Sequence, residues 1–136
     1  MSEKNRLAGA LSLMKRIQSA LSPDLLKKQY VEANKCNPMH GHCYVASEAL
    51  YHGLGDERAG YVPVRGRDDA GIVHWWLKNR ETGEILDPTA MQYTSLGMEP
   101  PYSRGTPAGF LTRDPSQRAR AILERIKSMN EIEDAR

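Results

Sequence analysis

A helix followed by a two-stranded hairpin, in the middle of the chain, most constrains how this sequence can fold. Residues with helical spacing run from Cys43 to about His52, where glycines end the pattern. Segments 72–78 and 84–88 alternate as strands do, on either side of the turn 80–83. Small alanine residues in the helix suit close packing on a sheet. The pattern predicts an α+β fold in which a central helix packs on a small antiparallel sheet.

Further helices are predicted on both sides of this core. A first helix over about 5–21 and a second from Ser22 to about 33, which opens with Ser-Pro-Asp, precede a loop over 34–41. A C-terminal helix opens with Asp-Pro-Ser-Gln (114–117), which resembles a capped helix start, and frays from Asn130. The apolar residues that predict the first and last helices are Leu7, Ala10, Leu11, Met14, Ile17 and Leu21, and Ala119, Ile122, Leu123, Ile126 and Met129.

Two other segments complete the expected architecture. Segment 61–65 is predicted to be an edge strand, because Pro63 cannot donate a hydrogen bond to a neighbouring strand. Segment 94–113 is rich in Gly, Pro, Ser and Tyr and is predicted to be a long irregular loop, of the kind that often lines a site.

The length of 136 residues supplies one modest core, so we expect a single domain over 1–136. Its parts are the N-terminal helices and loop (1–40), the central core (41–93), the long loop (94–113) and the C-terminal helix (114–130).

Composition and charge narrow the expected partners and location. The net charge of +2 is too small to indicate a nucleic-acid partner, and the basic residues near the C-terminal helix, Arg118 among them, are expected to form its solvated face. No apolar run approaches the roughly 20 residues that span a bilayer, and the N-terminus lacks the features of a signal peptide. Two cysteines, Cys36 and Cys43, form no disulfide framework. We therefore expect a cytoplasmic protein without a membrane partner; the sequence does not indicate an oligomeric state.

Cys43 is a candidate nucleophile because it is placed at the start of the central helix. The positive end of a helix dipole and the free backbone N–H groups there favour a thiolate. The alternative is that Cys43 is a small buried residue, as many free cysteines are.

His74 and Asp87 are candidate partners for this thiol. If the turn pairs Asn79 with Glu84, then Asp87 lies opposite Trp76 and diagonally across from His74, with Cβ atoms somewhat under about 7–8 Å apart. A carboxylate there can bind one ring nitrogen and leave the other for the thiol. The alternatives are a half-buried histidine packed on tryptophan, and an Asp-Pro pair that starts a turn.

Acyl-transfer chemistry also needs hydrogen-bond donors for the developing oxyanion. One is the backbone N–H of Cys43, and the second is the side-chain amide of Asn37 or a loop N–H. Asn37 has the alternative role of starting a turn before Pro38. His42, Trp75 and Trp76 are the other candidates for contact with a substrate.

A metal site is the competing interpretation of the same region. Cys36, His40, His42 and Cys43 are four zinc-competent residues within a short segment. Adjacent His42 and Cys43 do not converge easily on one ion, and no second pair of ligands follows. We therefore expect no metal, and the chemistry of a thiol nucleophile requires no other cofactor.

The motifs Gly-His-Cys-Tyr-Val-Ala (41–46), His-Trp-Trp (74–76) and Leu-Asp-Pro-Thr (86–89) resemble the transglutaminase-like branch of the papain-like cysteine enzymes. The resemblance covers about 41–89 and implies that branch's fold, with Cys43, His74 and Asp87 as a catalytic triad. His42 departs from the residue usual before the cysteine, and no clear oxyanion glutamine stands upstream. The short chain, its N-terminal helices and Gly-Phe-Leu-Thr (109–112) are also similar to small uncharacterised phage-type proteins with this core.

Two functions are consistent with these features. The first is a thiol enzyme in which Cys43 attacks an amide or related acyl group, His74 transfers protons and Asp87 orients His74. The substrate is a protein or peptide amide, or another small acyl compound. Water as acceptor makes the enzyme a peptidase, amidase or deamidase, and an amine makes it a transglutaminase or acyltransferase. The second is a non-catalytic module that retains the fold and docks a protein through the Trp75–Trp76 surface and the loop 94–113.

Overall fold

The computed structural model describes residues 3–26, 28–36 and 41–134. The helices are α1 (Glu3–Ala20), α2 (Val31–Cys36), α3 (Cys43–Leu54), α4 (Met91–Thr94) and α5 (Gln117–Asp134), with 3-10 turns η1 (Pro23–Leu25), η2 (Lys28–Tyr30), η3 (Asp56–Ala59) and η4 (Tyr102–Arg104). The strands are β1 (Tyr61–Arg67), β2 (Val73–Asn79), β3 (Ile85–Leu86) and β4 (Thr106–Pro107). Within the described ranges, no helix is both long and apolar enough to cross a membrane.

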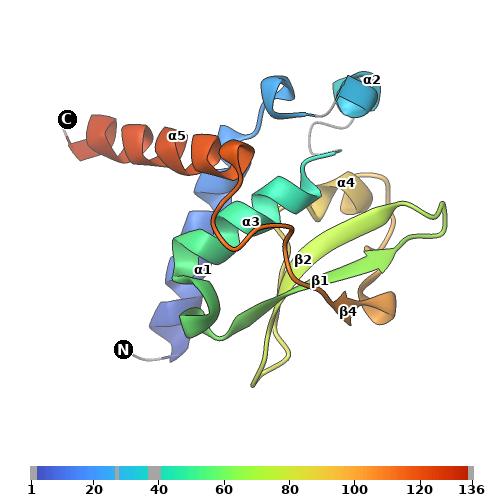
Figure 1. Ribbon diagram of the computed structural model, residues 1–136, viewed down its shortest axis with the longest axis horizontal. Helices are drawn as coiled ribbons and strands as arrows, with labels where there is room; N and C mark the ends of the chain where they lie inside the picture. Colours follow the sequence, from blue (N-terminus) through green and yellow to red (C-terminus); the bar gives the residue numbers. More distant parts are fainter. Residues whose placement is uncertain (1–2, 27, 37–40, 135–136) are drawn as a thin grey trace.

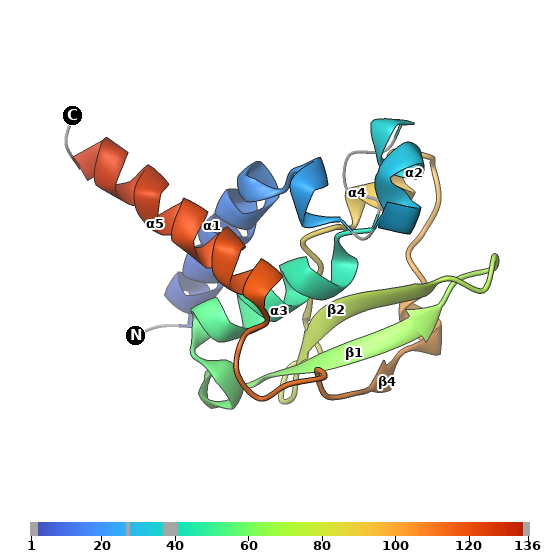
Figure 2. The same cartoon turned by 45° about the horizontal axis from the view of Figure 1, so that its top comes forward.

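The four strands form one antiparallel sheet in the order β3-β2-β1-β4. Helix α3 packs on β1 and β2, and α1 and α5 contact α3 and each other, so the three helices form a layer on one face of the sheet (Figures 1 and 2). The predicted α+β fold with a central helix on a small antiparallel sheet is confirmed.

An apolar core lies between the helical layer and the sheet. Its largest members, each at most 2% exposed, are Ile17, Leu50, Leu77, Leu86 and Ile122. The predicted stripe of α5 is confirmed, with Ala119, Ile122 and Ile126 buried and the other members packed against the core. In α1, Leu11 is 40% exposed and Leu13 packs against the core instead, because the buried line through Ala10 and Ile17 leaves Leu11 on its flank.

Strand β1 is not the edge strand that Pro63 predicts. It pairs with β2 along its whole length and with β4 on the other side. The carbonyl of Pro63 accepts a hydrogen bond from the N–H of Ala108, at 3.0 Å, so the proline nitrogen also points toward the β4 side. That side of the ladder is only two residues long, and β1 therefore tolerates a residue that lacks a donor.

The predicted second helix, from Ser22 to about 33, is wrong. The segment forms the separate turns η1 and η2 and then the short helix α2. Arg125 of α5 explains the break, because its guanidinium donates to the Ala20 carbonyl at 2.9 Å and to Ser22 Oγ at 2.7 Å and pairs with Asp24 at 2.5 Å. These tertiary contacts hold Ser22 and Asp24 on α5, and the turn that Ser22 opens ends at Leu25.

The hairpin register that the turn predicts is confirmed. Asn79 N–H donates to the Glu84 carbonyl at 2.8 Å, and Leu77 faces Leu86. Continuing this register places Asp87 opposite Trp76 and diagonally across from His74.

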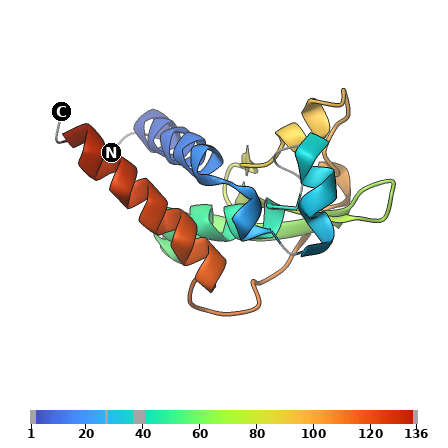
Figure 3. The same cartoon turned by 90° about the horizontal axis from the view of Figure 1, so that it is seen from above.

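The chain after β3 is more regular than a long loop. Turn η4 and strand β4 lie within segment 94–113, and helix α4 ends at its first residue. Helix α5 continues to Asp134 and does not fray from Asn130. Its first turn is fixed by Glu48 of α3, which is fully buried and accepts from Ser116 N–H at 2.8 Å and from Ser116 Oγ at 2.6 Å. Figure 3, from above, shows α5 crossing α3 at this end.

Candidate active site

The start of α3 lies beside an open edge of the sheet. Strand β3 ends at Leu86, so the carbonyls of Val73 and Trp75 on that edge of β2 have no strand partner. Two side chains one helical turn apart bind them instead. Ser47 Oγ donates to the Trp75 carbonyl at 3.2 Å, and the Cys43 thiol lies 3.7 Å from the Val73 carbonyl. The helix therefore replaces the missing strand and fixes Cys43 next to His74.

Gly41 allows the chain to enter α3 at this position. Its φ of +85° is a conformation that side-chain-bearing residues rarely adopt. A Cβ atom there would lie 2.7 Å from Cβ of Tyr30 and 2.9 Å from a methyl group of Leu26. Cys43 is then the first residue of α3, where its backbone N–H has no partner in the helical ladder and is oriented for an acceptor.

His74 and Asp87 form a buried hydrogen-bonded pair. The distance from His74 Nε2 to Asp87 Oδ2 is 2.7 Å, and the two residues are 0% and 6% exposed. The other ring nitrogen, Nδ1, is buried and makes no hydrogen bond to the residues that the structure describes. A buried polar atom without a partner is costly and calls for an explanation. Cys43 provides one, because its side chain lies close enough to His74 to interact with the ring.

Asp87 is held by more than His74. Its Oδ2 also accepts from the hydroxyl of Tyr102, at 2.9 Å, and its Oδ1 accepts from the backbone N–H and the hydroxyl of Thr89, at 3.1 and 3.4 Å. Gly105, three residues after Tyr102, lets the chain pass close to Trp76, because a Cβ atom at Gly105 would lie 2.5 Å from the Trp76 ring. The four hydrogen bonds hold both carboxylate oxygens and fix the orientation of the side chain.

The ring of His74 is also enclosed by aromatic side chains. It stacks on Trp76 at 5.7 Å and meets Tyr93 edge-on at 4.8 Å, and Tyr93 donates a hydrogen bond to Asp68 at 2.8 Å. Burial alone lowers the pKa of His74, but the hydrogen bond to Asp87 and the interaction with Cys43 outweigh it and raise the pKa from 6.5 to about 9. His74 is therefore an imidazolium near neutral pH.

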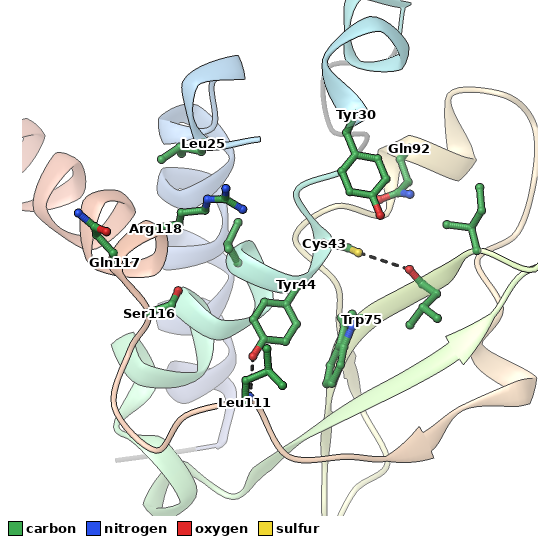
Figure 4. A pocket seen from close by; sticks show the side chains of 14 residues that line it. Leu25, Tyr30, Cys43, Tyr44, Trp75, Gln92, Leu111, Ser116, Gln117 and Arg118 are labelled. Carbon is green, nitrogen blue, oxygen red and sulfur yellow. Dashed lines mark hydrogen bonds between the residues drawn. The ribbon is translucent and has the colours of Figure 1, made fainter. Parts of the chain in front are cut away.

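A cavity of about 450 Å³ opens beside Cys43, and its size is that of pockets that hold small ligands. Figure 4 shows Cys43 on one side, the rings of Tyr30, Tyr44 and Trp75 around it, and Arg118 and Gln117 at the far end. The hydroxyl of Tyr44 accepts from the N–H of Leu111 at 2.7 Å. Of Cys43, His74 and Asp87, only Cys43 lines the cavity. The thiol is thus the group that a bound molecule meets.

The structure separates the remaining candidates for substrate contact. Trp75 lines the cavity and packs on Tyr44 at 5.0 Å. Trp76 is 1% exposed and lies on the opposite face of β2, so it forms no surface with Trp75, contrary to the docking surface expected from the sequence. His42 is fully buried and does not line the cavity. Asn37 lies outside the described residues.

The metal alternative finds no support among the described residues. No group of three or more His, Cys, Asp or Glu side chains within that part of the chain is arranged to hold a metal ion. His40, one of the four candidate ligands, and the side chain of Cys36 lie outside that part.

Sequence reasoning missed Tyr102, Thr89, Tyr93, Glu48 and Gln92. Gln92 of α4 brings a carboxamide to the cavity near Cys43. The only signal for Tyr102 was the tyrosine-containing loop 94–113, whose composition suggested that it borders a site. Thr89 follows Asp87 by two residues, a spacing that allows it to cap that carboxylate.

Searches against protein-family models, curated proteins and solved structures found no match to this chain. A function for this protein therefore has to be inferred from the geometry of the site.

Proposed function

We propose that the protein is a thiol enzyme that transfers acyl groups through Cys43, with a core like that of the transglutaminase-like branch of papain-like enzymes. One observation carries the proposal. His74 binds Asp87 through Nε2 and keeps a buried, unbonded Nδ1 beside a cysteine that opens a helix and lines a cavity. This is the relation of nucleophile, base and orienting group that covalent acyl transfer requires.

The proposed reaction begins from an ion pair in which Nδ1 of His74 already holds the proton of the Cys43 thiol, so that the sulfur is a thiolate. The sulfur then attacks the acyl carbon, a C–S bond forms, and the carbonyl electron pair moves onto oxygen. The Cys43 N–H stabilises that oxyanion, and the carboxamide of Gln92 is a side-chain donor that lines the cavity. When the intermediate collapses, the bond to the leaving group breaks and His74 donates its proton to that group.

The second half of the reaction releases the acyl group. Neutral His74 takes a proton from water or an amine, whose oxygen or nitrogen attacks the thioester carbon. The C–S bond breaks, and the sulfur recovers its electron pair as thiolate. Asp87 keeps the same ring nitrogen of His74 bound throughout, so Nδ1 remains the atom that exchanges the proton.

Trapping the acyl-enzyme tests this proposal. The full chain is mixed with p-nitrophenyl acetate, quenched in acid, and analysed by intact and peptide mass spectrometry. We expect an acetyl thioester on Cys43 that is retained in Cys36→Ser, lost in Cys43→Ala, and discharged faster by hydroxylamine. Acetylation confined to Cys36, or a Cys43 adduct that forms equally fast in His74→Gln, contradicts the proposal.

The burial of His74 favours a second candidate, a non-catalytic binding module. His74 and Asp87 do not line the cavity, and the cavity walls are mainly apolar and aromatic. In that function the His74–Asp87 pair is structural and Cys43 is inert. A module of this kind binds a ligand in the cavity equally well after Cys43→Ala and forms no covalent adduct.

A further inference from the structure

Among the described residues that line the cavity, Arg118 is the one with a positive charge. It lies on the first turn of α5, is half-buried, and lines the same cavity as Cys43. Figure 4 shows its guanidinium extending from α5 toward the part of the cavity where Tyr30 and Cys43 lie. Among the described residues, no hydrogen-bond acceptor or carboxylate binds it. The sequence predicts a residue on the solvated face of the helix, and the structure adds that Arg118 also lines the cavity.

Other arginines show what this chain does with a guanidinium that serves structure. Arg104 pairs with Asp69 at 2.6 Å, and Arg125 pairs with Asp24 at 2.5 Å. Arg65 lies over the ring of Trp75 at 5.9 Å. Arg118 has no comparable contact with the described residues, although its side chain is half-buried.

The position of Arg118 is also electrostatically unfavourable for the fold. Cations destabilise the N-terminal turn of a helix, and α5 has no acidic residue in its first turn. The carboxylate of Glu48 is near this turn, but both of its oxygens are occupied by Ser116. Glu48 forms no ion pair with Arg118 among the described residues, so the guanidinium at the end of the cavity opposite Cys43 is available to an anion.

We propose, on the basis of the proposed function, that the acyl substrate carries a carboxylate at the end distant from the acyl carbon, with an apolar segment between them. The thiol meets the acyl carbon, the rings of Tyr44 and Trp75 contact the apolar segment, and Arg118 binds the carboxylate. A guanidinium fits a carboxylate with two parallel hydrogen bonds. A single arginine in an apolar cavity suits one negative charge better than the two of a phosphate monoester.

The test uses Cys43 as a reporter of binding at Arg118, in a Cys36→Ser background. The probes are bromoacetyl derivatives of glycine, 4-aminobutyrate and 6-aminohexanoate, each as the free carboxylate and as the neutral amide. The rate of Cys43 alkylation is measured by peptide mass spectrometry and divided by the rate for free cysteine. The three chain lengths cover the span from the thiol to the guanidinium without assuming its value.

For one of the three chain lengths, we expect the carboxylate probe to alkylate Cys43 about tenfold faster than the amide probe of the same length. One charge-assisted hydrogen bond allows a difference of this size. Added salt should reduce this preference. Arg118→Gln should abolish it and Arg118→Glu should reverse it. Arg113→Gln, which removes an exposed charge from the neighbouring loop, is the matched control and should keep it.

If the ratio of the carboxylate rate to the amide rate is the same in wild type and Arg118→Gln at every chain length, the assignment of Arg118 is overturned. In that case, rapid alkylation of Cys43 by both kinds of probe leaves the proposed function standing. Alkylation of Cys43 no faster than free cysteine, with every probe, overturns both. Thermal melting of each variant confirms that differences in rate arise in the folded protein.

Discussion

The two faces of β2 are stabilised in different ways. On the helical face, Leu77 packs among apolar side chains from α1, α3 and α5. On the opposite face, His74 and Trp76 lie under α4 and η4, where contacts are hydrogen bonds to Asp87 and ring-to-ring packing with Tyr93 and Tyr102. Burial is extensive on both faces, since Leu77 and His74 are both 0% exposed.

The difference shows how one strand can stabilise the fold on one face and orient a side chain on the other. Apolar burial has no preferred direction, so it stabilises the sheet but cannot orient an imidazole. Hydrogen bonds are directional, and the four that reach Asp87 fix which nitrogen of His74 faces Cys43. Substitutions on the helical face should therefore change stability, and isosteric substitutions on the His74 face should change reactivity.

Asp87→Asn should have the largest effect. The amide preserves the shape of the side chain but no longer accepts from His74 with a full charge, so the imidazole loses its orientation and tautomer. We expect acyl-enzyme formation to slow by up to about 10⁴-fold, the loss seen for the same change in a serine triad. Stopped-flow release of p-nitrophenol measures it, and an unchanged rate would show that Asp87 only starts a turn.

Leu50→Ala is the corresponding change in the apolar core. The side chain is fully buried, and its removal should lower the free energy of unfolding by about 3–5 kcal/mol. Urea denaturation monitored by tryptophan fluorescence measures this loss. Under conditions in which the variant is still folded, the alkylation rate of Cys43 should stay within about threefold of wild type. A larger drop in that folded state would show that the two faces are coupled.

The stability of the wild-type protein should depend on pH through His74. Its pKa is raised from 6.5 to about 9 on folding, so the stabilisation is fully present below pH 6.5 and is lost as the pH rises through about 9. The loss amounts to up to about 3 kcal/mol. Denaturation midpoints between pH 6 and 9.5 test this. Asp87→Asn, which removes the main partner of the imidazolium, should flatten the curve, and an equal slope in both proteins would contradict the assignment.

Tyr102→Phe should have the smallest effect of the four. It removes one hydrogen bond from Asp87 but keeps the ring packed on Trp76 at 5.2 Å. We expect a loss of stability of about 1 kcal/mol and a slowing of acyl-enzyme formation by less than about tenfold. Calorimetry and the p-nitrophenol assay measure the two quantities. A slowing as large as that of Asp87→Asn would make Tyr102 a member of the proton-transfer machinery.

The sequence predicted the parts of this molecule that depend on local pattern. The start of α3 at Cys43 and the register that brings Asp87 to His74 follow from helix and turn signals within a few residues. The hydrogen bond from Tyr102 to Asp87 joins residues that are separated by a segment without helical or strand periodicity. No sequence pattern within a few residues of either one predicts this contact.

The wrong predictions have the same origin. Ser-Pro-Asp is a good helix start, but Arg125 binds Ser22 and Asp24 from the other end of the chain. Pro63 predicts an edge strand, but the short strand β4 pairs with β1 at Val64 and Arg65, beyond the proline. The cavity position of Arg118 depends in the same way on tertiary structure, because it follows from where α5 lies.

The central claim is that His74 activates Cys43, and the alkylation rate of Cys43 at pH 6 tests it most directly. Iodoacetamide labelling is measured by peptide mass spectrometry in a Cys36→Ser background, with His74→Gln as the test variant. The matched control is His52→Gln, since His52 also pairs with a carboxylate, that of Asp56 at 2.5 Å, but on the far turn of α3. We predict that Cys43 reacts faster than free cysteine at pH 6, that His74→Gln removes this advantage, and that His52→Gln keeps it. Equal rates in the two histidine variants, or a wild-type rate no faster than free cysteine, would contradict the account.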